Sequence, residues 1–98
     1  MQYNFEWDPN KALSNVEKHG ITFEEAGEVF LDDLHISIFD AEHSQHEERW
    51  ITLGKNRKGH LIVVIHTFEE HNHQNVNLRI ISARNATKHE QQQYEEIP

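Results

Sequence analysis

The run Leu61-Ile62-Val63-Val64-Ile65 places the tightest limit on what this chain can fold into. All five side chains are apolar, without the alternation of a strand that has one face in water, so we expect a central strand covered on both faces. Residues 49–55 are also β-like, and Gly59 in the connecting segment can adopt a positive φ. The two runs therefore predict a β-hairpin at the centre of a sheet.

Three further segments are expected to complete this sheet. Tyr3, Phe5 and Trp7 alternate with polar residues, which is the period of a half-buried strand. Residues 34–39 form a β-rich run bounded by aspartates, and residues 76–83 form a last strand after a polar loop at 69–74. The sequence thus predicts five strands.

Helix signals occur in three places. Asp8-Pro9 resembles an N-cap followed by proline at the first helical position, and Gly20 can end that helix in a left-handed conformation. Thr22-Phe23-Glu24-Glu25 and Thr87-Lys88-His89-Glu90 both have capping-box spacing. We expect an α+β domain with a mainly antiparallel five-stranded sheet, an N-terminal helical hairpin and a short C-terminal helix.

Length and charge limit the possible functions. The chain has 98 residues without a long polar tract, so we expect one domain over residues 1–98. It has no cysteine and no apolar stretch long enough to span a membrane, which favours a cytoplasmic protein. The balance of 9 basic to 17 acidic residues, with a net charge of -8, argues against coating of nucleic acid by bulk electrostatics.

Motifs along nearly the whole chain are similar to those of one family, the BrnT toxins. Each motif is short, but their order and spacing together are specific over residues 5–95. The motifs are Phe5-Glu6-Trp7-Asp8, Lys11, Asn15, Lys18-His19-Gly20, Phe23, Ala26, Phe30, His43, Glu48-Arg49, Gly54, Arg79, Ile81-Ser82-Ala83-Arg84, Ala86-Thr87, Glu90 and Tyr94.

This resemblance implies a fold like that of the RelE and ParE toxins, and a ribonuclease activity that inhibits translation. It also implies a BrnA-like ribbon-helix-helix antitoxin, a 2:2 assembly with that antitoxin, and operator DNA bound only through the complex. No cofactor or membrane is implied. The acidic charge departs from the basic character of RelE-type ribonucleases.

RNA cleavage without metal needs a base, an acid, and cations for the charge that develops on the phosphate. An exposed arginine after the last strand can grip phosphate in a bidentate manner, which makes Arg84 the first candidate. We expect Arg84, Arg49, Lys18, His19, Glu48 and His43 to be catalytic, and Arg79, Tyr94 and Trp7 to bind substrate.

Each candidate also has a structural interpretation. Arg84 could form a salt bridge to an acidic neighbour instead of binding phosphate. Strand alternation places Arg49 and Glu48 on opposite faces of the sheet, so they would not both face one site. Lys18 and His19 complement the negative end of a helix dipole. Tyr94 and Trp7 have the character of core residues.

The histidines raise a different possibility. His43 and His46, and likewise His71 and His73, have pair spacings that occur in metal sites, but neither pair has an evident third ligand. Three functions follow from the sequence: a metal-independent endoribonuclease, an inactive toxin fold that binds antitoxin and co-represses its operon, and a metal hydrolase using histidine and carboxylate ligands.

Overall fold

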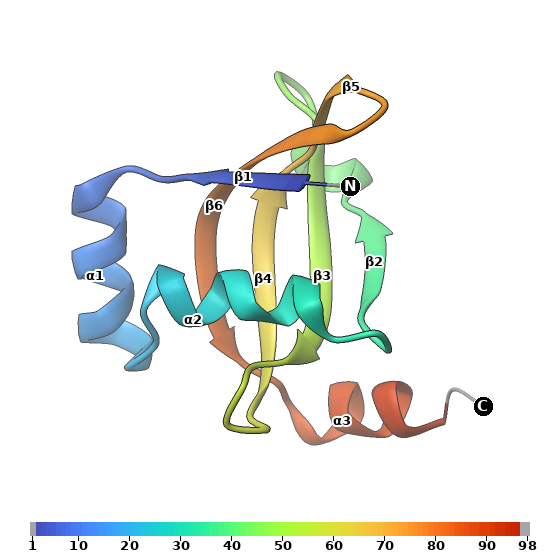
Figure 1. Cartoon of the computed structure of the whole chain (residues 1–98). Coiled ribbons are helices and arrows are strands. Elements are labelled where there is room, and N and C mark those ends of the chain that lie inside the picture. The colour runs from blue at the N-terminus through green and yellow to red at the C-terminus, as the bar shows by residue number, and fades with distance from the viewer. Residues whose placement is uncertain (1, 97–98) are drawn as a thin grey trace.

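The computed structural model describes residues 2–96, which form one sheet with helices on both of its faces (Figure 1). The elements in order are β1 Gln2–Glu6, α1 Pro9–His19, α2 Phe23–Gly27, the 3₁₀ helix η1 Glu28–Leu31, β2 Ile36–Phe39, the 3₁₀ helix η2 Ala41–His43, β3 Arg49–Lys55, β4 Leu61–Thr67, β5 Glu69–Asn72, β6 Asn75–Asn85 and α3 Lys88–Glu95.

The sheet is mainly antiparallel, as predicted, but it has six strands instead of five and one of its pairings is parallel, so it is mixed. The main order is β1-β6-β4-β3-β2, with β5 paired to β6 off this path. β1 runs parallel to β6, with Tyr3 opposite Val76, whereas the other pairs are antiparallel. A parallel partner more than 70 positions away leaves no local pattern, and β5 is polar, so backbone pairing alone makes it a strand.

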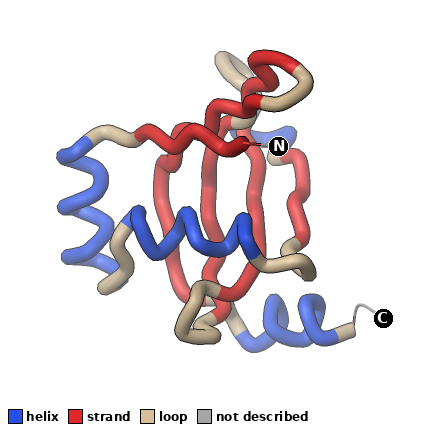
Figure 2. Tube along the Cα trace, in the orientation of Figure 1, coloured by secondary structure: helices blue, strands red, loops and turns tan. Residues whose placement is uncertain are grey.

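Strand β4 lies between β3 and β6, as its apolar run predicts. Successive side chains of β4 point to opposite faces, and both faces are covered at this strand. We call the face beneath α1 and α2 the helical face, and the opposite face the open face. Figure 2 shows α2 and the following 3₁₀ turn crossing the sheet, with α3 near its lower end.

The main hydrophobic core lies between the sheet and the two N-terminal helices. Phe23, Ala26 and Val29 are fully buried and pack on side chains from β4 and β6. The rest of this cluster consists of Ile21, Phe30, Ile62, Val64, Val76, Leu78, Ile80 and Ala83.

A smaller core covers one end of the open face. Tyr94 of α3 packs with Leu53 and Val63, and the part-buried Ile51 and Ile65 border this group. Ile38, on the neighbouring β2, is 59% exposed. The open face is thus covered near α3 and accessible near the start of β3.

The predicted helix ends are confirmed. Asp8 accepts a hydrogen bond from the Asn10 N–H, and Gly20 ends α1 with φ of 69°. Thr22 and Thr87 each form a complete capping box, with Glu25 and Glu90 respectively. Within residues 2–96, no helix has the length and apolar character needed to cross a membrane.

Asn15, within α1, joins this helix and the segment that follows it to strand β6. Its amide nitrogen donates to the carbonyls of Ile21 (3.0 Å) and Ala83 (2.9 Å), and its oxygen accepts from the Ala83 N–H (3.0 Å). Asn15 is 5% exposed, so water cannot replace these bonds. One side chain therefore fixes two segments that lie 68 positions apart.

Replacing Asn15 by alanine should lower the free energy of unfolding by about 2–4 kcal/mol, because buried backbone groups of Ala83 and Ile21 lose their partners. Urea unfolding followed by circular dichroism measures this change. Ser14→Ala, on the same helix, is the control and should change stability by less than about 0.5 kcal/mol. Equal stability of the two variants would contradict the role given to Asn15.

Candidate functional site

Three arginines point to the open face of the sheet. Arg49 begins β3, and its side chain lies on the same face as that of Leu53. Arg79 lies between Leu78 and Ile80 on β6, whose side chains are in the main core, so the Arg79 side chain points to the opposite face. Arg84 lies opposite Val63, also on the open face. Arg49 and Arg84 are paired to positions four residues apart on β4, a separation of about 13 Å along the strand.

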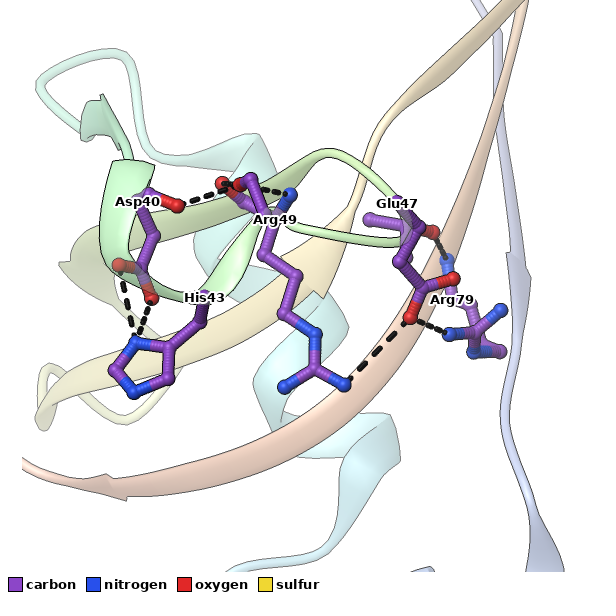
Figure 3. Close-up of polar contacts among 7 residues, drawn as sticks. Asp40, His43, Glu47, Arg49 and Arg79 are labelled. Atoms are coloured by element: carbon purple, nitrogen blue, oxygen red, sulfur yellow. Dashed lines mark hydrogen bonds and ion pairs between the residues drawn. The ribbon is translucent and has the colours of Figure 1, made fainter.

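Glu47 bridges Arg49 and Arg79 at the accessible end of this face (Figure 3). Its Oε1 accepts a short hydrogen bond from Arg79 and lies 3.6 Å from an Arg49 guanidinium nitrogen. The hydrogen bond from Arg79 is the main reason that the pKa of the Glu47 carboxyl is lowered. Two cations share one carboxylate here, so the group retains positive charge.

His43 lies beside this group and is oriented by Asp40. The His43 Nδ1 is 2.9 Å from Asp40 Oδ2, and the imidazole side chain is 63% exposed. Ser44 fixes the loop because its hydroxyl donates to the Asp40 carbonyl and accepts from the Arg49 N–H at 2.9 Å. In Figure 3 the Arg49 guanidinium lies between the His43 ring and the Glu47 carboxylate.

Arg84 is engaged by α3. Its guanidinium donates to both carboxylate oxygens of Glu90, at 2.8 and 2.9 Å. This bidentate pair lowers the pKa of Glu90 to about 2 and raises that of Arg84. Glu90 also completes the capping box of α3. The salt-bridge interpretation of Arg84 thus describes its contacts in this structure.

Lys18 and His19 lie outside this arrangement. They occupy the exposed last turn of α1, which packs against β6 from the helical face. The structure therefore does not bring them together with Arg49, Arg79 or Arg84. Their position fits their electrostatic role at the helix end.

Of the remaining sequence candidates, two pack in the hydrophobic core and one lines a surface cavity. Trp7 is half-buried and packs edge-on against Phe23, while Tyr94 is buried and donates to Asp32 at 2.5 Å. Burial, together with Asp32, raises the pKa of Tyr94 to about 12. Glu48 lines a cavity of about 410 Å³ next to Arg79, which it shares with Glu6, Glu47, Glu69 and Glu70.

Sequence reasoning missed Glu47, Asp40 and Ser44. Glu47 stands beside Glu48 in the sequence, and nothing in the local pattern indicates which of the two turns toward the arginines. Asp40 and His43 are three positions apart, which is within reach of a single turn. That spacing was the available signal for the pair.

The histidine pairs gain no third ligand. Within residues 2–96, no three histidine or carboxylate side chains are grouped so that they could hold a metal ion. His71 and His73 lie exposed in β5 and the turn after it, and His46 is exposed before β3.

Comparison with known proteins identifies the family. The family model described as "Ribonuclease toxin, BrnT, of type II toxin-antitoxin system" matches residues 7–90 of the sequence. The chain belongs to the BrnT family. The crystal structure of the Brucella abortus ribonuclease toxin BrnT aligns with a TM-score of 0.61 over 90% of this chain and 100% of that chain. The two sequences are 24% identical, so this alignment shows a shared fold. No curated protein matches the sequence.

Membership of the BrnT family places this chain among ribonuclease toxins of type II toxin–antitoxin systems and implies an antitoxin partner. The resemblance inferred from the sequence motifs is confirmed. The further likeness to RelE and ParE stays a prediction.

The Arg84–Glu90 pair predicts a specific pH dependence of stability. Because the pKa of Glu90 is lowered from 4.5 to about 2, its carboxylate stabilises the fold fully above pH 4.5 and loses this effect as pH falls toward 2. Allowing for the 41% exposure of Arg84, we expect a contribution of about 1–2 kcal/mol.

Glu90→Gln should remove this contribution, since glutamine keeps the capping hydrogen bonds but not the charge. Unfolding measured from pH 7 to pH 2 should show a variant that is less stable at pH 7 and converges with the parent at pH 2. Glu95→Gln, on the exposed part of the same helix, is the matched control. A constant difference across the whole range would contradict the assignment.

Proposed function

We propose that this chain is a metal-independent endoribonuclease whose catalytic groups lie on the open face around Arg49 and Arg79. The observation that carries the proposal is the sharing of Glu47 by these two arginines beside an exposed histidine. Membership of a ribonuclease toxin family supports the activity. The experiment that tests the site is comparison of RNA cleavage by arginine variants.

The two guanidinium groups would bind the scissile phosphate. A phosphate oxygen can take the place of the Glu47 carboxylate, since arginine donates to either group in the same bidentate geometry. In the transition state, negative charge grows on the phosphate oxygens. Preorganised cations therefore stabilise the transition state more than they stabilise the ground state. This is the largest contribution that we assign to the site.

Glu47 and His43 would move the protons. Cleavage requires one group to take the proton from the 2′-hydroxyl as its oxygen attacks phosphorus, and another to give a proton to the departing 5′-oxygen. The arginines that lower the pKa of Glu47 also weaken it as a base, and their turn toward phosphate would relieve this effect. His43, held by Asp40, flanks Arg49 on the other side.

Arg84 has a different place in this proposal. It lies farther along the open face and is bound to Glu90, so we assign it mainly to the docking of α3. The centre of the proposed site is therefore the Arg49–Glu47–Arg79 group, with Lys18, His19 and Trp7 outside it. Glu48 lines the acidic cavity next to Arg79.

We further propose that the antitoxin is a BrnA-like ribbon-helix-helix protein that forms a 2:2 complex with this chain, and that operator DNA is bound through the antitoxin. The net charge of -8 supports contact with a basic partner and disfavours direct DNA binding by this chain.

A second function is favoured by one observation. Five glutamates line the cavity next to Arg79, and such a cavity repels RNA. A chain that kept the fold and the antitoxin surface but lost nuclease activity would then serve as an operon co-repressor. Induced expression separates the two functions, since growth arrest that the antitoxin relieves requires the active toxin.

Arg49→Ala and Arg79→Ala should each lower the rate of RNA cleavage about 100-fold or more, because each removes a cation from the transition state. Arg84→Ala should have a smaller effect on the rate. Cleavage of a labelled RNA by purified variants measures this order, with Arg57→Ala in the exposed β3–β4 turn as control. The largest loss in Arg84→Ala, with full activity in Arg49→Ala, would overturn the assignment.

Cleavage should continue at the same rate in excess EDTA, because the proposed acid, base and cations are all side chains. The products should carry 2′,3′-cyclic phosphate and 5′-hydroxyl ends. Loss of cleavage in EDTA that added divalent metal restores would instead favour the metal hydrolase.

A further inference from the structure

Strand β2 forms an open edge of the sheet. It is the last strand in the order β1-β6-β4-β3-β2 and pairs with β3 on one side (Figure 1). Ser37, Ile38 and Phe39 are all exposed, Ile38 to 59%. Proteins usually protect such an edge with lysine, proline or a bulge. Residues 36–39 contain no lysine or proline and pair with β3 in a regular register, so this edge is open to a further strand.

The hydrogen bonds to β3 determine which backbone groups of β2 face outward. Just after β2, the Asp40 N–H donates to the Arg49 carbonyl at 2.8 Å, in the register that continues from the strand. Along an antiparallel ladder, hydrogen-bonded pairs alternate with pairs that are not hydrogen-bonded. The N–H and C=O groups of Ser37 and Phe39 therefore point away from β3, toward the open edge.

These outward groups allow two copies of β2 to pair with each other. If a two-fold axis passes at Ser37, the Ser37 N–H of each copy meets the Ser37 carbonyl of the other in an antiparallel pair. In this register Ile36 lies opposite Ile38 of the second copy, so apolar side chains meet twice on the open face. An axis at Ile38 would instead place Ile36 opposite Asp40. The side chains thus favour the axis at Ser37.

The chemistry of this edge fits a second copy of the chain. Residues 36–39 carry no charge, so the paired segment does not require a partner of opposite sign. Its backbone groups and its two isoleucines are complementary to themselves in one register, as a two-fold contact requires. A second copy therefore satisfies the edge without any further sequence.

We propose that this chain forms a two-fold dimer in which the β2 strands pair antiparallel around Ser37. The two sheets then become one, and both open faces lie on the same side. A pairing of four residues per copy buries less than the about 1,200 Å² of a stable complex, so the dimer is weak and dissociates on dilution. This inference concerns assembly and does not depend on the proposed nuclease activity.

The charge of the chain determines how the dimer responds to salt. Each copy has a net charge of -8, so the copies repel each other and salt screens this repulsion. The dimer should therefore become tighter as salt rises from about 0.05 M to about 0.5 M. A basic partner strand would bind less tightly over the same range.

Sedimentation of the intact chain over a range of concentrations measures the monomer–dimer equilibrium. Ile38→Lys should weaken the dimer at least about tenfold, because it places a charge opposite Ile36 of the second copy. Leu13→Lys makes the same change of charge at a side chain of α1 that is 66% exposed, and it should dimerise as the parent does. Circular dichroism checks that both variants are folded.

Three results would overturn the proposal. The first is a chain that stays monomeric up to about 1 mM, the weakest association that the account allows. The second is equal dimerisation of the two lysine variants. The third is a monomeric chain whose binding to the antitoxin is lost in Ile38→Lys, which would assign the edge to the antitoxin.

Cross-linking tests the register. The chain has no cysteine, so a single introduced cysteine reports one position. A short bis-maleimide should join two copies of Ser37→Cys, because these side chains lie opposite each other in the dimer. In Phe39→Cys the two cysteines lie four positions apart along the strands, about 13 Å, and should be joined far less. Equal cross-linking of the two variants would contradict the axis at Ser37.

Discussion

A single buried amide links the N-terminal helices to the strand that carries the basic groups. Asn15 holds α1 against Ala83 of β6, and β6 is the strand that joins parallel β1 to antiparallel β4. β6 also carries both Arg79 and Arg84 on the opposite face. The three hydrogen bonds of Asn15 thus connect the helical layer to the strand that positions the basic groups, and only a residue with both a donor and an acceptor can make them.

The two faces of the sheet have different roles because they are covered differently. The helical face holds the main core, which supplies most of the stability. The open face is covered at one end by α3 through Tyr94 and the Arg84–Glu90 pair, which leaves Arg49 and Arg79 accessible at the other. The proposed site therefore lies at strand ends that the main core holds in place. Its positive charge comes from two arginines in a chain that is acidic as a whole.

Local signals in the sequence predicted the local structure. The Asp8 and Gly20 helix ends, the two capping boxes and the β3–β4 hairpin each depend on residues that are close in the chain. The β1–β6 pairing was missed because it joins distant segments, and β5 because its side chains are polar. For the site, strand alternation predicted that Arg49 shares a face with Leu53, but it could not reveal that Glu47 turns toward Arg79 or that Glu90 engages Arg84.

The central claim is that RNA binds to the open face at Arg49 and Arg79. It is tested most directly by NMR titration with a short RNA whose 2′-hydroxyls are methylated, so that it binds but cannot be cleaved. We expect the largest changes at the side-chain N–H signals of Arg49 and Arg79, with none at Lys18 and His19. Changes centred on the end of α1, with Arg49 and Arg79 unaffected, would contradict the account.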